Sequence, residues 1–101
     1  MPRLLTDDEV ARQLADLTDW SRPPDDPTAI RATFELTDFV AALDFVNQVG
    51  HQAELMNHHP DIDIRWNKVT LTLCTHSEGG LTPLDIELAN RISHETGVGG
   101  D

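Results

Sequence analysis

The sequence predicts a single α+β domain over residues 1–101, with a four-stranded antiparallel sheet and three helices packed on one face. Two patterns predict these two layers. Three segments begin with helix-capping residues and continue with apolar residues at helical spacing. Other segments alternate apolar and polar residues, as strands with one buried face do. Residues 96–101 are expected to form a frayed tail.

The first two helices are predicted from their ends. Thr6 and Glu9 have the spacing of a capping box, which starts the first helix. The second helix is predicted to begin at residues 37–38 and to carry a long apolar stripe. It must stop near His58, because Pro60 pushes the residue before it into an extended conformation.

The third helix is predicted to begin at the motif LTPLD. Thr82 is its expected cap, Pro83 suits the first helical position, and Asp85 is the acid of the capping box. Capping alone is therefore enough to explain Asp85. Alternation predicts strands at residues 30–36, 61–66 and 68–74, and a weaker fourth strand around Trp20, before the breaker run PPDDP.

Two of these strands are predicted to form a hairpin, with residues 61–66 and 69–75 joined through Asn67 and Lys68. Apolar side chains then face one another in three pairs: Trp66 and Val69, Ile64 and Leu71, Ile62 and Leu73. Extending this register places His59 opposite His76. Directly opposed residues have Cβ atoms about 4.5–5.5 Å apart, so a histidine patch is expected at this end of the hairpin.

The predicted patch contains His58, His59 and His76, with Glu54 one helical turn before His58. Imidazoles titrate near neutral pH, so one can donate a proton while another accepts one. A metal site with the same four residues as ligands is an alternative, but their spacing matches no standard zinc pattern. A helix-ending loop without chemistry is the other alternative. We expect no bound metal.

Charge and composition exclude several classes of function. The chain has 7 basic and 18 acidic residues, a net charge of −11, which disfavours nucleic acids and polyphosphate substrates. Its one cysteine, Cys74, cannot form an internal disulfide, which suits a reducing compartment. No segment has the ~20 apolar residues of a membrane span. The sequence therefore predicts a soluble, cytoplasmic protein without membrane or nucleic-acid partners.

One set of residues resembles the signature of the pterin-4a-carbinolamine dehydratases: Glu54, His58-His59-Pro60, Trp66, His76 and Asp85. The segments FELTDFVAALDFVNQV and THSEGGLTPLDIELANRI, and DWS around Trp20, are also similar to that family, so the resemblance covers about residues 5–93. Two features depart from it: Asn57 stands where an aspartate is common, and the PPDDP segment is unusual.

The resemblance implies a hydro-lyase that dehydrates 4a-hydroxytetrahydropterin to quinonoid dihydropterin in tetrahydropterin recycling, without a cofactor. It implies His58, His59 and His76 as catalytic residues, and Glu54 and Asp85 as orienting residues. Trp20 and Trp66 are expected to be core or pocket-wall residues, and as pocket-wall residues they would bind or orient the substrate.

The sequence is also compatible with two other functions. The chain could be a non-catalytic dimerisation or interaction module, or it could act on a related pterin, such as a molybdopterin intermediate. A homodimer or homotetramer is expected, because a short open sheet leaves an edge strand that a second copy can pair with.

Overall fold

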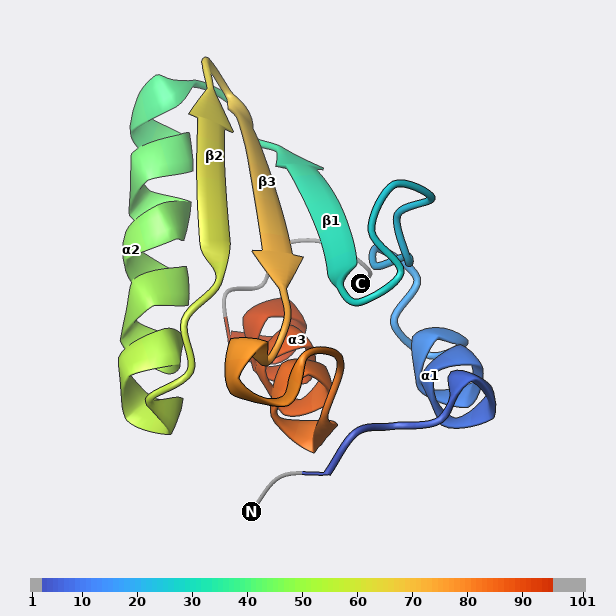
Figure 1. The fold of residues 1–101 in the computed structure, drawn as a ribbon. Helices are drawn as coiled ribbons and strands as arrows, with labels where there is room; N and C mark the ends of the chain where they lie inside the picture. Colours follow the sequence, from blue (N-terminus) through green and yellow to red (C-terminus); the bar gives the residue numbers. More distant parts are fainter. Residues whose placement is uncertain (1–2, 96–101) are drawn as a thin grey trace.

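The structure is a computed structural model that describes residues 3–95, so the predicted tail at 96–101 lies outside the described residues. Within them, three α-helices, three strands and one short 3₁₀ helix follow in sequence (Figure 1). Their bounds are α1 Asp7–Leu14, β1 Ile30–Glu35, α2 Phe39–Met56, β2 Asp61–Arg65, β3 Lys68–Leu73, η1 His76–Glu78 and α3 Pro83–Glu95. The predicted α+β class is confirmed.

The first two helices begin at their predicted caps. The Thr6 hydroxyl accepts from the Glu9 amide at 3.1 Å, and the Glu9 carboxylate accepts from the Thr6 amide at 2.9 Å, which completes the capping box. Asp38 caps α2 by accepting from the Ala41 amide at 2.8 Å. At the other end of α2, Asn57 adopts the left-handed conformation (φ 49°) and ends the helix just before His58.

The sheet is antiparallel with the order β1-β3-β2. The predicted hairpin register was wrong by two residues: Ile62 faces Leu71 and not Leu73. The turn residues are Trp66 and Asn67, because both the side chain and the main-chain carbonyl of Asn67 form hydrogen bonds with the main chain of Leu36. The Asn67 side-chain amide donates to the Leu36 carbonyl, and its own carbonyl accepts from the Leu36 amide, both at 2.8 Å. An even shift keeps every side chain on its predicted face.

The core lies between one face of the sheet and the helices (Figure 1). The inward residues of β1 and β3 are almost fully buried: Ile30, Ala32, Phe34, Val69, Leu71 and Leu73. Helices α2 and α3 pack over this face, and α1 adds Val10 to the same core. The opposite face is polar, with the Thr33 and Thr70 hydroxyls 2.9 Å apart. The two layers of the prediction are therefore present.

The structure shows three of the four predicted strands. The segment around Trp20 makes a single antiparallel bridge, between Ser21 and Arg31. Pro23 and Pro24 follow Ser21 after one intervening residue and have no amide hydrogen to extend the pairing. Trp20 itself is buried, edge-on against Phe34 with ring centroids 6.3 Å apart. No helix among residues 3–95 is long and apolar enough to span a membrane.

Candidate active site

The end of α2 directs two adjacent histidines to different environments. After the left-handed residue Asn57, the His58 amide donates to the Ala53 carbonyl at 3.1 Å and closes the helix end. The chain then leaves the helix in an extended conformation toward β2. As a result the His58 side chain is buried (8% exposed), whereas His59 is exposed.

His58 contacts a buried carboxylate, Asp85, in the first turn of α3. The Nε2 atom of His58 lies 2.6 Å from Oδ1 of Asp85. The other oxygen, Oδ2, accepts from the Thr75 hydroxyl at 2.8 Å and from the Thr82 amide at 2.9 Å. Asp85 has no solvent exposure. Capping, predicted as a sufficient explanation of Asp85, therefore accounts for only one of its three contacts.

His59 forms a second histidine–carboxylate pair, with Glu54. Its Nε2 atom lies 2.5 Å from Oε2 of Glu54, and the two side chains are 55% and 77% exposed. Helical spacing predicts that Glu54 contacts His58, but His58 lies beyond the end of α2, and Glu54 contacts His59 instead. The structure thus contains one buried pair and one exposed pair on consecutive histidines.

His76 begins η1 and is exposed to solvent. Its position is fixed by the residues on either side of the short loop: the Thr75 amide donates to the Gly80 carbonyl at 2.9 Å. Gly79 allows this closure because its φ of 75° is left-handed, a conformation that favours glycine. Thr75, which orients Asp85, immediately precedes His76, so the loop joins the two parts of the site.

The histidines gather at one end of the sheet, but not by the predicted pairing. His59 lies two residues before the start of β2, and His76 lies three residues after the end of β3. The observed register pairs Asp61 with Thr72, so these strand ends are neighbours. His59 and His76 are not directly opposed across the hairpin, because both lie beyond the ladder.

The two tryptophans are placed differently from the histidines. Trp66 lies in the turn between β2 and β3, at the far end of β2 from His59, and is 67% exposed. Figure 1 shows this turn at the opposite end of the two strands from α3. Trp20 is buried, and its indole N–H is the one buried side-chain polar atom in the described part of the chain without a hydrogen-bond partner. Buried N–H groups are normally paired, so this donor is available to a ligand or a water molecule.

Sequence reasoning missed two residues near the site. Thr75 carried no signal by itself, because a hydroxyl in a strand pattern is ordinary. Asp26, in the PPDDP segment, interacts electrostatically with His76. Hydrogen bonds from Thr28 lower the pKa of Asp26, and the positive charge of Arg31 adds to this effect. Burial raises the pKa of the Cys74 thiol, whose sulfur lies 3.9 Å from the Gly80 carbonyl.

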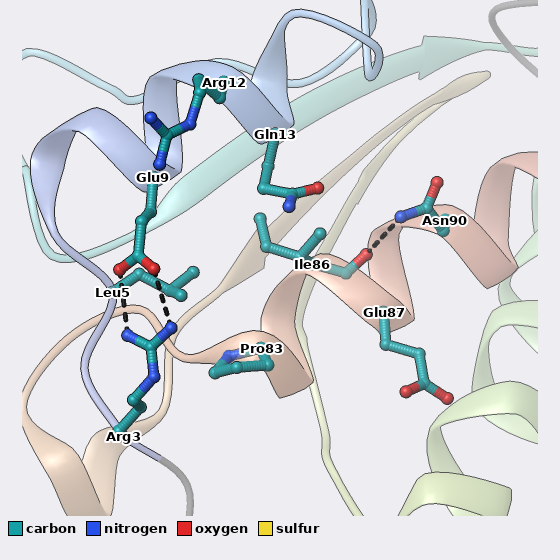
Figure 2. A pocket seen from close by; sticks show the side chains of 9 residues that line it. All are labelled: Arg3, Leu5, Glu9, Arg12, Gln13, Pro83, Ile86, Glu87 and Asn90. Atoms are coloured by element: carbon teal, nitrogen blue, oxygen red, sulfur yellow. Dashed lines mark hydrogen bonds and ion pairs between the residues drawn. The ribbon is translucent and has the colours of Figure 1, made fainter.

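A cavity of about 400 Å³ lies elsewhere, between α1 and α3 (Figure 2). Arg3 and Glu9 form a two-pronged ion pair at one side of it, at 2.9 and 2.7 Å. Figure 2 shows the side chains of Gln13, on α1, and Ile86, on α3, pointing toward each other. None of the predicted site residues lines this cavity.

Within residues 3–95, no three histidine, cysteine or acidic side chains come close enough together to hold a metal ion. The donors are divided between two pairs, each a histidine with its own carboxylate. Such pairs orient an imidazole and fix which nitrogen carries the proton. The arrangement is therefore suited to proton transfer.

Comparison with known proteins gives a consistent result. The family model "Pterin 4 alpha carbinolamine dehydratase" matches residues 3–95. Proteins of Roseiflexus castenholzii and Nocardia farcinica, both named "Putative pterin-4-alpha-carbinolamine dehydratase", are each 51% identical to this chain, over 92 and 89 residues. These matches cover 91% and 88% of this chain, and 96% and 90% of the relatives.

A solved structure is also similar. The crystal structure of a transcriptional coactivator/pterin dehydratase from Brucella melitensis superposes with a TM-score of 0.85 and 36% sequence identity. The match covers 90% of this chain and 96% of that one. Sequence and structure agree over nearly the whole length: this chain belongs to the pterin-4a-carbinolamine dehydratase family.

Proposed function

We propose that this protein is a hydro-lyase that removes water from pterin-4a-carbinolamine to give quinonoid dihydropterin, by histidine acid–base catalysis. The observation that carries the proposal is the buried His58–Asp85 contact at 2.6 Å, beside the exposed His59–Glu54 pair. In the reaction the C4a–O bond breaks, a protonated imidazole gives its proton to the departing hydroxyl, and a neutral imidazole takes a proton from the adjacent ring nitrogen. No net proton is consumed.

The Asp85 contact supports a defined role for His58. A carboxylate only accepts hydrogen bonds, so the His58 nitrogen that faces it, Nε2, carries a proton. In the neutral ring the other nitrogen, Nδ1, is then left as an acceptor. We assign proton transfer to His58, His59 and His76 as a set, with Asp85 and Glu54 as positioning residues and Trp20 as a substrate contact.

The test compares single histidine variants in a stopped-flow assay of quinonoid dihydropterin formation. His76→Ala is expected to keep its fold, because the side chain is exposed, and to slow turnover by a factor on the order of 10²–10⁴. His94→Ala is the matched control: His94 is also exposed, lies on α3, and should turn over normally. Wild-type turnover by His76→Ala would contradict the proposed site and favour an interaction module.

We also propose a homo-oligomer, at least a dimer, in a reducing cytoplasm. The outer edge of β2 supports the first part, because the sheet order leaves this strand without a partner on that side in the described residues. The lone thiol of Cys74 supports the second part. Sedimentation velocity at micromolar concentration tests the oligomer, and a monomer would contradict it.

A further inference from the structure

The cavity between α1 and α3 has apolar side chains from both of the segments that frame it. The Leu5 amide donates to the Leu81 carbonyl at 2.8 Å, which ties the chain before α1 to the chain before α3. The cavity measures about 400 Å³, within the range of small-molecule sites. Its apolar lining consists of Leu5, Pro83 and Ile86. Ile86 is buried and Leu5 packs against the core, so the fold itself positions this apolar surface.

Two amide side chains add hydrogen-bonding groups to the cavity. The Asn90 side-chain amide donates to the Ile86 carbonyl at 3.1 Å, and its own oxygen has no protein donor within residues 3–95. The Gln13 side-chain amide has no protein partner in the described part of the chain. Figure 2 shows this amide directed from α1 toward Ile86. An unpaired amide that points at an apolar side chain can form its hydrogen bonds with a bound molecule.

Arg12 is the one charged side chain lining this cavity that has no ion pair among residues 3–95. The other three are neutralised: Arg3 pairs with Glu9 at 2.7 Å, and Glu87 pairs with Arg91 at 2.9 Å. Arg12 lies in the last turn of α1 and is exposed. Its guanidinium is therefore free to bind an anion at the cavity.

Most basic residues of this acidic chain are neutralised by carboxylates. In the structure of residues 3–95, Arg12 and Lys68 are the exceptions. Lys68 lies at the start of β3 and does not line the cavity, whereas Arg12 does. The basic residues that form ion pairs with carboxylates are Arg3, Arg22, Arg31, Arg65 and Arg91.

These features together select the chemistry of a ligand. A guanidinium binds a carboxylate through two parallel hydrogen bonds, so Arg12 favours a carboxylate. The apolar lining favours a ring beside that carboxylate. A single unpaired cation in a chain of net charge −11 disfavours polyanions, so the ligand should carry one negative charge.

We propose that this cavity is a second binding site, and that it takes a small aromatic monocarboxylate. The carboxylate binds Arg12, and the ring lies on Leu5 and Ile86. The cavity shares no residue with the histidine patch, and the proposal does not rest on the proposed function. Ile86 directly follows Asp85, so the first turn of α3 contributes a residue to each of the two sites.

NMR titration of the full-length, ¹⁵N-labelled chain with benzoate tests the proposal. The backbone amides of the cavity should shift together, with one dissociation constant on the order of 1 mM for a ligand of about nine non-hydrogen atoms. Benzamide has the ring without the charge, and inorganic phosphate has the charge without the ring, so each should bind at least about tenfold more weakly. Benzamide binding as tightly as benzoate would overturn the role of Arg12. Phosphate binding as tightly would overturn the role of the apolar lining.

Variants of exposed residues locate the ligand without disturbing the fold. Arg12→Gln should raise the dissociation constant of benzoate by about tenfold, and Arg12→Lys by less, because lysine keeps the charge but lacks the planar fork. Lys68→Gln is the matched control: it removes the same charge from an exposed residue outside the cavity and should leave benzoate binding unchanged. Gln13→Trp should fill the cavity and abolish binding. Circular dichroism melts check the fold of each variant.

The same titration separates this cavity from the histidine patch. His76→Ala should bind benzoate as the wild-type protein does. Absence of saturable shifts at the cavity amides, shifts confined to His59 and His76, or equal losses in Arg12→Gln and Lys68→Gln would overturn the site. The titration involves no turnover, so it decides this inference even if the wild-type protein dehydrates no pterin and the proposed function fails.

Discussion

Replacing Asp85 should separate the stability of the protein from its catalysis. Asp85 is fully buried and contacts three groups: the Thr75 hydroxyl, the Thr82 amide and Nε2 of His58, at 2.8, 2.9 and 2.6 Å. Asp85→Ala leaves all three without their acceptor. An unsatisfied buried donor costs about 1–3 kcal/mol, and rearrangement recovers part of this, so we expect a loss of about 3 kcal/mol. Capping alone would predict only about 1 kcal/mol.

Asp85→Asn is the sharper variant, because it keeps the shape of the side chain. Its oxygen can still accept from Thr82, so stability should fall by only about 1 kcal/mol. Its NH₂ group then faces His58 where an oxygen stood, and Nε2 must accept a hydrogen bond and give up its proton to Nδ1. The acceptor that the substrate requires is lost, and turnover should fall by a factor on the order of 10²–10⁴.

Urea unfolding followed by circular dichroism measures the first effect, and stopped-flow kinetics with ¹⁵N NMR of the imidazole measures the second. Asp44→Asn, on the exposed side of α2, is the control and should change stability by less than about 0.5 kcal/mol. Wild-type turnover by Asp85→Asn, with the His58 proton still on Nε2, would contradict the role proposed for the His58–Asp85 contact. A loss below about 1 kcal/mol for Asp85→Ala would refute the buried-network account.

Three further predictions concern single groups. The rate of Cys74 alkylation by iodoacetamide should rise with pH with a midpoint above the ordinary thiol pKa of 9.0, because burial disfavours the thiolate; a midpoint below 9.0 would contradict this. Hydrogen bonds from Arg3, and next from the Thr6 amide, lower the pKa of Glu9 from 4.5 to about 2. The stability that ionised Glu9 contributes is therefore present above pH 4.5 and lost as the pH falls toward 2. Carboxyl NMR should show this midpoint, and Arg3→Met should raise it. Elemental analysis should find no stoichiometric metal, whereas one zinc ion per chain that His76→Ala removes would favour a metal site.

Much of the fold could be predicted because its signals are local. A capping box needs only Thr6 and Glu9, and burial on one face of a strand needs only alternation. The hairpin register could not be predicted in this way. Turn chemistry favoured Asn67 and Lys68 as the two turn residues. Two hydrogen bonds to Leu36, 31 residues earlier in the chain, instead fix Asn67 as the second turn residue, after Trp66. That contact joins residues that are distant in the sequence, so the sequence of the hairpin alone does not reveal it.

The structure brings the candidate histidines to one end of the sheet, but the carboxylates that they contact differ from the predicted ones. Helical spacing suggested Glu54 as the neighbour of His58, yet the rule holds only while the chain is helical. The left-handed residue Asn57 ends the helix, and Glu54 contacts His59. The carboxylate that His58 contacts comes from Asp85, 27 residues further on, and only the folded arrangement of α2, β3 and α3 brings it there.

The conformation of residue 57 also limits what sequence differences among relatives can reveal about activity. Asparagine, aspartate and glycine all tolerate left-handed φ, whereas β-branched residues do not. A change between the tolerated types at this position can accumulate by neutral drift, because the backbone and not the carboxylate is what the helix end requires. The absence of an acid at position 57 is therefore no evidence that the enzyme has lost its reaction, and a β-branched residue there would be the informative difference.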